Sequence, residues 1–167
     1  MAQSENLPEF ADRFDHRVRS LVAVHDLLQD SQSGRRDISE IASAVLSPYL
    51  AGSRESIEIG GPRCDLGRRS AMALALILNE LATNAAKYGA LSLPSGSVGL
   101  KWSERPSFLE FHWSERGGPK IAAPEKTGYG TRFIESSVQS LGGEHSFDFG
   151  RRGLHFTMSI PAHALSS

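Results

Sequence analysis

The residues of this chain most suited to chemistry lie in an otherwise apolar stretch, residues 74–91. Four polar or charged side chains interrupt it: Glu80, Asn84, Lys87 and Tyr88. Their spacing places them on one face of a predicted helix. Burying a carboxylate, a carboxamide and an ammonium is unfavourable unless partners satisfy them, and a ligand rich in oxygen and metal charge would do so. A polar strip along a solvent-exposed helix edge explains the same spacing, so periodicity alone leaves both interpretations open.

Two glycine-rich segments later in the chain, residues 113–118 and 128–131, could approach an anion. Their candidate contact residues are Glu115, Gly117, Gly118, Gly128, Gly130 and Thr131. Glycines ahead of a helix let backbone N–H groups come close to an anion, which the helix dipole also favours. Neither a GxxxxGK[ST] P-loop nor a strand followed by GxGxxG is present. Ordinary loop punctuation is the alternative explanation for each segment taken alone.

The elements that must position these residues begin with two predicted helices. In residues 8–30, apolar residues recur at steps of three and four and give one stripe. The stripe consists of Phe10, Phe14, Val18, Leu21, Val22, His25 and Leu28. After a break at residues 31–34, a second amphipathic helix is expected from Asp37 to near Pro48. Such a pair indicates a helical hairpin or a helix that leads into a domain.

The rest of the chain alternates between strands and helices. Alternating apolar residues predict a short strand at 56–61, a hairpin from 98–102 and 108–113, and a terminal hairpin from 145–149 and 154–160. Gly89 is expected to cap the apolar helix, and Gly142 to end a helix that begins at Thr131. Residues 117–130 predict a long functional loop.

Composition limits the class of protein. The 167 residues are 40% hydrophobic and 22% charged with a net charge of -1, which is typical of one ordinary globular domain. The absence of a basic excess argues against a nucleic-acid partner. A single cysteine, Cys64, excludes an internal disulfide framework and fits a reducing compartment. No apolar run approaches the roughly 20 residues of a membrane span, so a cytoplasmic location is expected.

Together, the segments resemble the ATP-binding domain of the GHKL superfamily, and specifically that of HWE-type sensor histidine kinases. Residues 79–91 (NELATNAAKYGAL) resemble the N box of that family, and residues 113–119 resemble its Trp-x-Glu form of the G1 box. Residues 128–131 (GYGT) resemble the G2 box, and residues 153–161 the closing strand. The resemblance covers about residue 10 to the end. It implies an α+β fold, a two-layer α/β sandwich of the Bergerat ATP-binding type with an N-terminal helical segment.

The resemblance also implies roles for the residues of the apolar helix. Asn84 would bind Mg²⁺ through its carboxamide oxygen, which suits a hard cation. Glu80, one turn earlier, would hold a metal-bound water or polarise the attacking group. Lys87 would neutralise phosphate charge, and Tyr88 would lie against the nucleotide. The reaction would be in-line phosphoryl transfer from Mg-ATP to a histidine.

The two glycine segments would complete the nucleotide site. Glu115 would accept a hydrogen bond from the adenine amino group. The expected backbone and hydroxyl contacts to ATP come from Gly117, Gly118, Gly128, Gly130 and Thr131. The loop between the segments would be the ATP lid, with Lys120 and Lys126 as candidate phosphate contacts.

The sequence departs from the family at the histidines. The His that precedes the N-box Glu in the family is Asn79 here; Asn still donates and accepts hydrogen bonds, and its effect on rate stays open. His16 begins an H-box-like sequence, but residues 25–28 (HDLL) resemble the second helix of the dimerisation hairpin, which is the better register. His16 is therefore expected to be an ordinary surface residue in a chain that lacks the acceptor helix, and His25 to pack or cap.

The expected organisation follows from this register. Residues 1–50 would form the second dimerisation helix and a linker, and residues 51–167 the ATP-binding catalytic domain. The expected partners are a response regulator and a second copy of the chain, joined through a helical hairpin. Two alternatives remain: an anti-sigma-type protein serine kinase, which the HDLL helix opposes, and a degenerate nucleotide-free scaffold or phosphotransfer partner, which intact Glu80 and Asn84 oppose.

Overall fold

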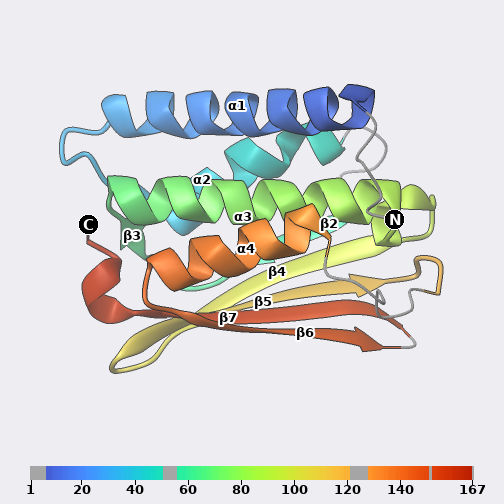
Figure 1. The fold of residues 1–167 in the computed structure, drawn as a ribbon. Helices are drawn as coiled ribbons and strands as arrows, with labels where there is room; N and C mark the ends of the chain where they lie inside the picture. The colour runs from blue at the N-terminus through green and yellow to red at the C-terminus, as the bar shows by residue number, and fades with distance from the viewer. Residues whose placement is uncertain (1–6, 51–55, 121–127, 151, 167) are drawn as a thin grey trace.

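A five-stranded sheet, covered by helices on one face, organises the fold (Figure 1). The computed structural model describes residues 7–50, 56–120, 128–150 and 152–166, apart from the Glu9 side chain. The described elements are α1 (Leu7–Gln29), β1 (Arg36–Asp37), α2 (Ile38–Leu46), η1 (Ser47–Leu50), β2 (Ile57–Gly60), β3 (Asp65–Leu66), α3 (Arg68–Lys87), η2 (Ala90–Ser92), β4 (Ser97–Glu104), β5 (Phe108–Arg116), α4 (Tyr129–Ser140), β6 (Glu144–Gly150), β7 (Gly153–Pro161) and η3 (Ala162–Ala164). None of the described helices combines the length and apolar content needed to cross a bilayer.

The sheet has the strand order β2-β4-β5-β7-β6, and β2 runs parallel to β4 while the other neighbours are antiparallel. Both predicted hairpins are confirmed. Every second residue of β5 faces inward, which buries Leu109, Phe111 and Trp113. The strand continues to Arg116, so Glu115 lies on the same inner face rather than in a loop after the strand.

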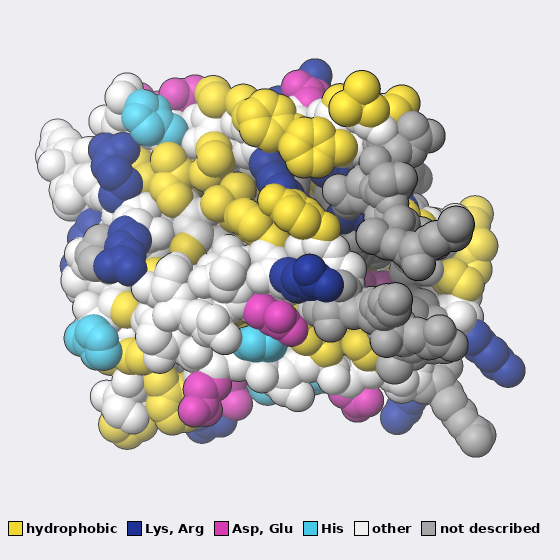
Figure 2. All heavy atoms as spheres, in the orientation of Figure 1, with side chains coloured by type: hydrophobic (Ala, Val, Ile, Leu, Met, Phe, Trp, Pro, Cys, Tyr) yellow, Lys and Arg dark blue, Asp and Glu magenta, His cyan; other side chains and the backbone are white. Residues whose placement is uncertain are grey.

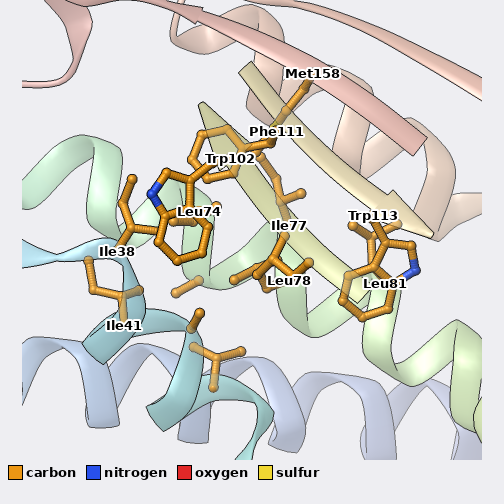
Figure 3. Close-up of a cluster of buried hydrophobic side chains, with 14 of the residues drawn as sticks. Ile38, Ile41, Leu74, Ile77, Leu78, Leu81, Trp102, Phe111, Trp113 and Met158 are labelled. Carbon is orange, nitrogen blue, oxygen red and sulfur yellow. The ribbon is translucent and has the colours of Figure 1, made fainter. Parts of the chain in front are cut away.

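The core lies between the sheet and α3. Leu74 and Ile77 of α3 point toward Trp102 and Phe111 of the sheet (Figure 3). Residues of α1 and α2, including Ile41, join the same hydrophobic cluster. Seen in Figure 1, α1 lies outside α3, on the side away from the sheet. The predicted α+β arrangement of a helical layer on a sheet, with an N-terminal helical segment, is confirmed.

Gly89 has a different role from the one predicted. α3 ends at Lys87 with Tyr88 as its C-cap, and Gly89 adopts an extended conformation with φ -108° rather than the left-handed conformation of a C-cap glycine. A side chain at this position would collide with Glu115 Oε2. Close approach of the two segments, rather than backbone handedness, therefore requires glycine here. Gly142, in contrast, has φ +69° just after α4 and ends that helix as predicted.

The apolar stripe predicted along the first helix lies largely at the surface. Five of the large apolar residues of α1 are exposed: Leu7, Phe10, Phe14, Val18 and Val22. Figure 2 shows hydrophobic side chains gathered along the upper part of the molecule, where α1 lies. The residues of α1 that turn inward are Arg13, Ser20, Val24 and Leu28. The helix is amphipathic as predicted, but its buried face is polar at the N-terminal end and apolar at the C-terminal end.

Two valines of α1 test which face of the helix is buried. Val24 is 0% exposed and Val22 is 53% exposed. Because truncation removes two buried carbon groups and leaves a cavity, Val24→Ala is expected to lower the free energy of unfolding by about 2 kcal/mol. Val22→Ala, the matched control, should change it by less than about 0.5 kcal/mol. Equal losses in urea unfolding would contradict the observed orientation of α1.

Candidate functional site

The polar residues of α3 contact the N-terminal part of the chain. The contacts are Ser20 Oγ to Asn79 Oδ1 (3.0 Å), Arg17 Nε to Glu80 Oε1 (2.5 Å), Tyr49 OH to Thr83 Oγ1 (2.8 Å) and Lys87 Nζ to Asp12 Oδ2 (3.2 Å). Three of these partners belong to α1 and the fourth to η1. Much of the polar face of α3 is therefore a contact surface between helices, because Asn79, Glu80, Thr83 and Lys87 all contact α1 or η1.

Glu80 is the most enclosed charged residue of this surface, with 1% of its side chain exposed. Oε1 accepts the hydrogen bond from Arg17, and Oε2 lies 3.6 Å from Arg13 Nη1. A carboxylate can be buried in this way when cations surround it. The compensation that the sequence led us to expect from a metal-bearing ligand comes, in this structure, from two arginines of α1.

The start of α4 lies beside Glu80. A Cβ at Gly130 would come within 2.9 Å of Glu80 Oε2 and 3.0 Å of Arg13 Nη1. Gly128 is the N-cap of α4, and no side chain among the described residues caps this end. Unpaired N–H groups at a helix N-terminus favour an anion. Thr131 is half-buried in the same first turn.

Asn84 connects this corner to the C-terminal end of α3. Its Nδ2 atom lies 3.7 Å from the Cβ position of Gly130, and the side chain is half-buried. Its backbone oxygen accepts hydrogen bonds from the N–H groups of Tyr88 (2.8 Å) and Gly89 (3.1 Å). The structure thus brings Glu80, Asn84 and Gly130 together, as the predicted site requires.

Glu115 belongs to a second group of residues, where β5 meets η2. Its Oε2 accepts a hydrogen bond from the Ala90 N–H (2.9 Å), and its Oε1 accepts one from Trp113 Nε1 (3.1 Å). Burial raises the pKa of Glu115 above its usual range, and the two N–H donors oppose that rise only in part. Both oxygens already have partners within the protein, so Glu115 joins β5 to the segment after α3.

Gly117 and Gly118 complete this second group through close backbone packing. Gly117 has φ +71°, and a Cβ there would lie 2.7 Å from the Ser95 carbonyl oxygen. A Cβ at Gly118 would lie 2.6 Å from the Ala90 Cα. Both positions therefore require glycine for contacts inside the chain itself.

The other predicted residues lie around these two groups. Tyr88 is exposed at the end of α3, and Lys120 is exposed after β5. Lys126, in the predicted lid, falls outside the described residues. His16 lies on α1 with Nε2 3.6 Å from Asp12 Oδ1, and His25 lies near the other end of the same helix.

The sequence analysis missed Arg13 and Arg17. A signal was present, because Arg13, Arg17, Ser20, Val24 and Leu28 follow one another at steps of three and four. The more apolar stripe beside them instead predicts the neighbouring face as the one that organises the helix. Pairing this second face with the acidic residue of α3 would have required knowing that the two helices pack together.

Comparison with known proteins identifies relatives of the whole chain. Residues 1–63 match the family model described as HWE histidine kinase. The chain is 34% identical over 166 residues to blue-light-activated histidine kinase 1 of Erythrobacter litoralis, which covers 96% of this chain and 46% of that protein. It is 33% identical over 160 residues to the blue-light-activated histidine kinase of Brucella melitensis, with 92% and 33% covered. The chain thus spans less than half the length of these curated relatives.

Solved structures agree with the fold. The histidine kinase domain of the Erythrobacter litoralis EL346 blue-light-activated histidine kinase superposes with a TM-score of 0.72 at 21% identity, covering 91% of this chain and 76% of that one. The histidine kinase domain of the E. coli osmosensor EnvZ gives a TM-score of 0.54 at 16% identity, covering 76% and 87%. The predicted resemblance to HWE histidine kinases is confirmed by the sequence matches.

Glu115→Gln tests the paired carboxylate. Glutamine offers one acceptor oxygen to the two donors, Ala90 N–H and Trp113 Nε1–H, so one of them loses its partner. The free energy of unfolding at low pH should fall by about 1–3 kcal/mol. Urea unfolding of both proteins measures the difference.

The same comparison carries a pH dependence. A carboxyl whose pKa is raised by folding favours the folded state in its protonated form. Its contribution is complete below the unfolded pKa and is lost as the pH rises through the raised folded pKa. The advantage of the wild type over Glu115→Gln should therefore shrink as the pH rises through that interval. An advantage that grows with pH would show that the carboxylate, rather than the carboxylic acid, is the form the fold prefers.

Proposed function

Because the chain is homologous to histidine kinases along 96% of its length, we propose that it is the ATP-binding and catalytic module of a two-component histidine kinase. Its reaction is phosphoryl transfer from Mg-ATP to a histidine. The observation that carries the proposal is the meeting of Asn84 with Glu80 and the glycine-rich start of α4. An oxygen ligand, a carboxylate and an uncapped helix N-terminus at one corner suit a magnesium-bound phosphate group.

The residues at this corner fit Mg-ATP. The Asn84 side chain makes no hydrogen bond with the described residues, so its oxygen is available to Mg²⁺. A Cβ at Gly128 would meet no atom of the described residues within 4 Å, so those residues leave the first turn of α4 open. The N–H groups of that turn, with Gly130 and Thr131, bind phosphate oxygens. When bound, Mg-ATP would supply the phosphoryl group, and its Mg²⁺ would compensate the negative charge of the phosphates.

The remaining residues have supporting roles in this proposal. Lys87, now paired with Asp12, lies one turn beyond Asn84 and contributes positive charge near the phosphates. Tyr88 lies against the nucleotide. Glu115, Gly117 and Gly118 lie at the end of the site that binds the adenine base, called the base end. The carboxylate of Glu115 accepts a hydrogen bond from the adenine amino group in addition to those from its internal donors.

Glu80 acts next to the transferred group. Its Oε2 faces Gly130 and accepts no hydrogen bond from the described residues. This oxygen orients the attacking group or a water molecule, while Oε1 stays on Arg17. The chain's own contribution to the reaction is therefore binding, orientation and exclusion of water.

The organisation of the longer protein is also a proposal. Residues 1–50 act as the second dimerisation helix and linker, and residues 51–167 as the catalytic domain. The exposed apolar residues of α1, including Phe10 and Phe14, support packing against a further helix of a dimeric hairpin. The histidine that accepts the phosphoryl group then lies on that further helix and is not His16. The partner in signalling is a response regulator, in the cytoplasm.

A nucleotide-free scaffold is the second candidate. Two observations favour it. Glu80 Oε1 already accepts a hydrogen bond from Arg17, and Asn79 stands before Glu80 where the resembled family has a histidine. A scaffold requires no Mg-ATP binding, which separates the two candidates.

Calorimetric titration with Mg-ATP tests the proposed function. Wild type should bind, and Asn84→Ala should bind on the order of tenfold more weakly, which corresponds to about 1.4 kcal/mol. The reason is loss of a magnesium ligand, so the difference should vanish when the titration is repeated with ATP and a chelator. Gln139→Ala, an exposed change near the far end of α4, is the matched control and should bind as wild type does. Equal affinity of Asn84→Ala and wild type would overturn the assignment, and no binding by wild type would favour the scaffold.

A further inference from the structure

Arg17 of α1 contacts both helices that build the proposed phosphate corner, α3 and α4. Its Nε donates to Glu80 Oε1 of α3 at 2.5 Å. Its Cζ lies 4.4 Å from the centre of the Phe133 ring and 5.2 Å from that of Tyr129, both in α4. Only 12% of the side chain is exposed. A single guanidinium therefore joins α1, α3 and the first turn of α4.

The chemistry of the guanidinium suits this position. It is planar, so it can donate hydrogen bonds in its plane while aromatic rings lie against its face. Burial opposes its charge, but the Glu80 carboxylate and the Tyr129 hydroxyl outweigh burial, and the pKa of Arg17 lies above its usual value. The group remains charged, and the direction of its N–H bonds fixes the direction of the carboxylate.

The carboxylate of Glu80 has little freedom beside it. Arg13 Nη1 lies 3.6 Å from Oε2, and that oxygen faces the Cβ position of Gly130. Rotation of the carboxylate would break its contact with Arg17 and leave a buried charge poorly compensated. The position of α1 thus determines which oxygen of Glu80 is directed at the start of α4.

We propose that Arg17 is a positioning residue, through which α1 sets both the orientation of Glu80 and the placement of the first turn of α4. This inference rests on the proposed function, in which Glu80 and that turn meet the transferred phosphoryl group. A shift of α1 then changes the geometry of the reaction without touching the nucleotide. Small misplacement of an orienting group costs rate far more than affinity.

Three variants separate this role from a merely structural one. Arg17→Ala removes the guanidinium, whereas Arg17→Lys keeps the charge but loses the planar group that lies on Phe133. Arg19→Ala is the matched control, since Arg19 is 77% exposed on the same helix and pairs only with Asp15 on the surface among the described residues. Each full chain is examined for Mg-ATP affinity by calorimetry, for ADP formation by hydrolysis at saturating Mg-ATP, with water as the phosphoryl acceptor, and, without nucleotide, for amide hydrogen exchange in residues 129–133.

Arg17→Lys is expected to form ADP on the order of tenfold more slowly with nucleotide affinity within about threefold of wild type. Its amides in residues 129–133 should exchange faster. Arg17→Ala should show larger changes in the same direction, and if it fails to fold, Arg17→Lys alone decides. Arg19→Ala should match wild type in all three measurements.

Two results would overturn the proposal. If Arg17→Lys matches wild type in both rate and exchange, Arg17 only stabilises the fold. If ADP formation becomes faster, the contact restrains Glu80 instead of positioning it. If wild type binds no Mg-ATP, the proposed function fails and the kinetic role of Arg17 fails with it; hydrogen exchange, measured without nucleotide, then still decides whether Arg17 orders the start of α4.

Discussion

The buried ion pair between Arg17 and Glu80 determines how the N-terminal helix lies on the rest of the protein. A hydrophobic interface between two helices tolerates some sliding, but a carboxylate with no access to water needs its cation in one place. The neighbouring contacts, from Ser20 to Asn79 and from Asp12 to Lys87, run in opposite sequence order along the two helices, so α1 and α3 pack antiparallel. Further along α1, the apolar residues Val24 and Leu28 continue the buried face. The polar end of this face therefore specifies the position of α1, and the apolar end supplies much of the favourable burial.

The base end of the proposed site is built in a different way. Alternation along β5 places Glu115 on the inner face, next to Trp113, and the strand has no freedom to turn it outward without also exposing its neighbours. Gly89 and Gly118 bring the backbone against this carboxylate and against Ala90. Backbone packing of this kind has one arrangement, whereas the phosphate end depends on long side chains from α1. The two ends of the site thus differ in how easily a movement of α1 can alter them.

The sequence was sufficient where structure follows from local periodicity, and insufficient where it follows from contacts between distant segments. The strands around Phe111 and the apolar helix around Ile77 were predicted because their patterns repeat every two or every three to four residues. The partner of Glu80 lies 63 positions away, and no local pattern pairs the two residues. Gly89 was misassigned for the same reason, because its neighbour Glu115 is distant in sequence. The proposed nucleotide contacts come from the family resemblance, and the physical pattern alone predicts only that α3 carries a polar face in need of partners.

The proposed boundary near residue 50 separates two tasks more than it separates two folded units. Val24 of α1, Ile41 of α2 and Ile77 of α3 belong to one hydrophobic cluster, so α1 cannot leave α3 without exposing apolar surface as well as a buried charge. A signal that acts through α1 is therefore expected to produce small shifts that keep a guanidinium near Glu80, and not a separation of the helices. Arg13, which lies 3.6 Å from the second oxygen of Glu80, places a second cation beside the carboxylate and adds to the cost of separating the helices. The two arginines at consecutive turns of α1 therefore limit any such shift to one that keeps both cations close to the carboxylate.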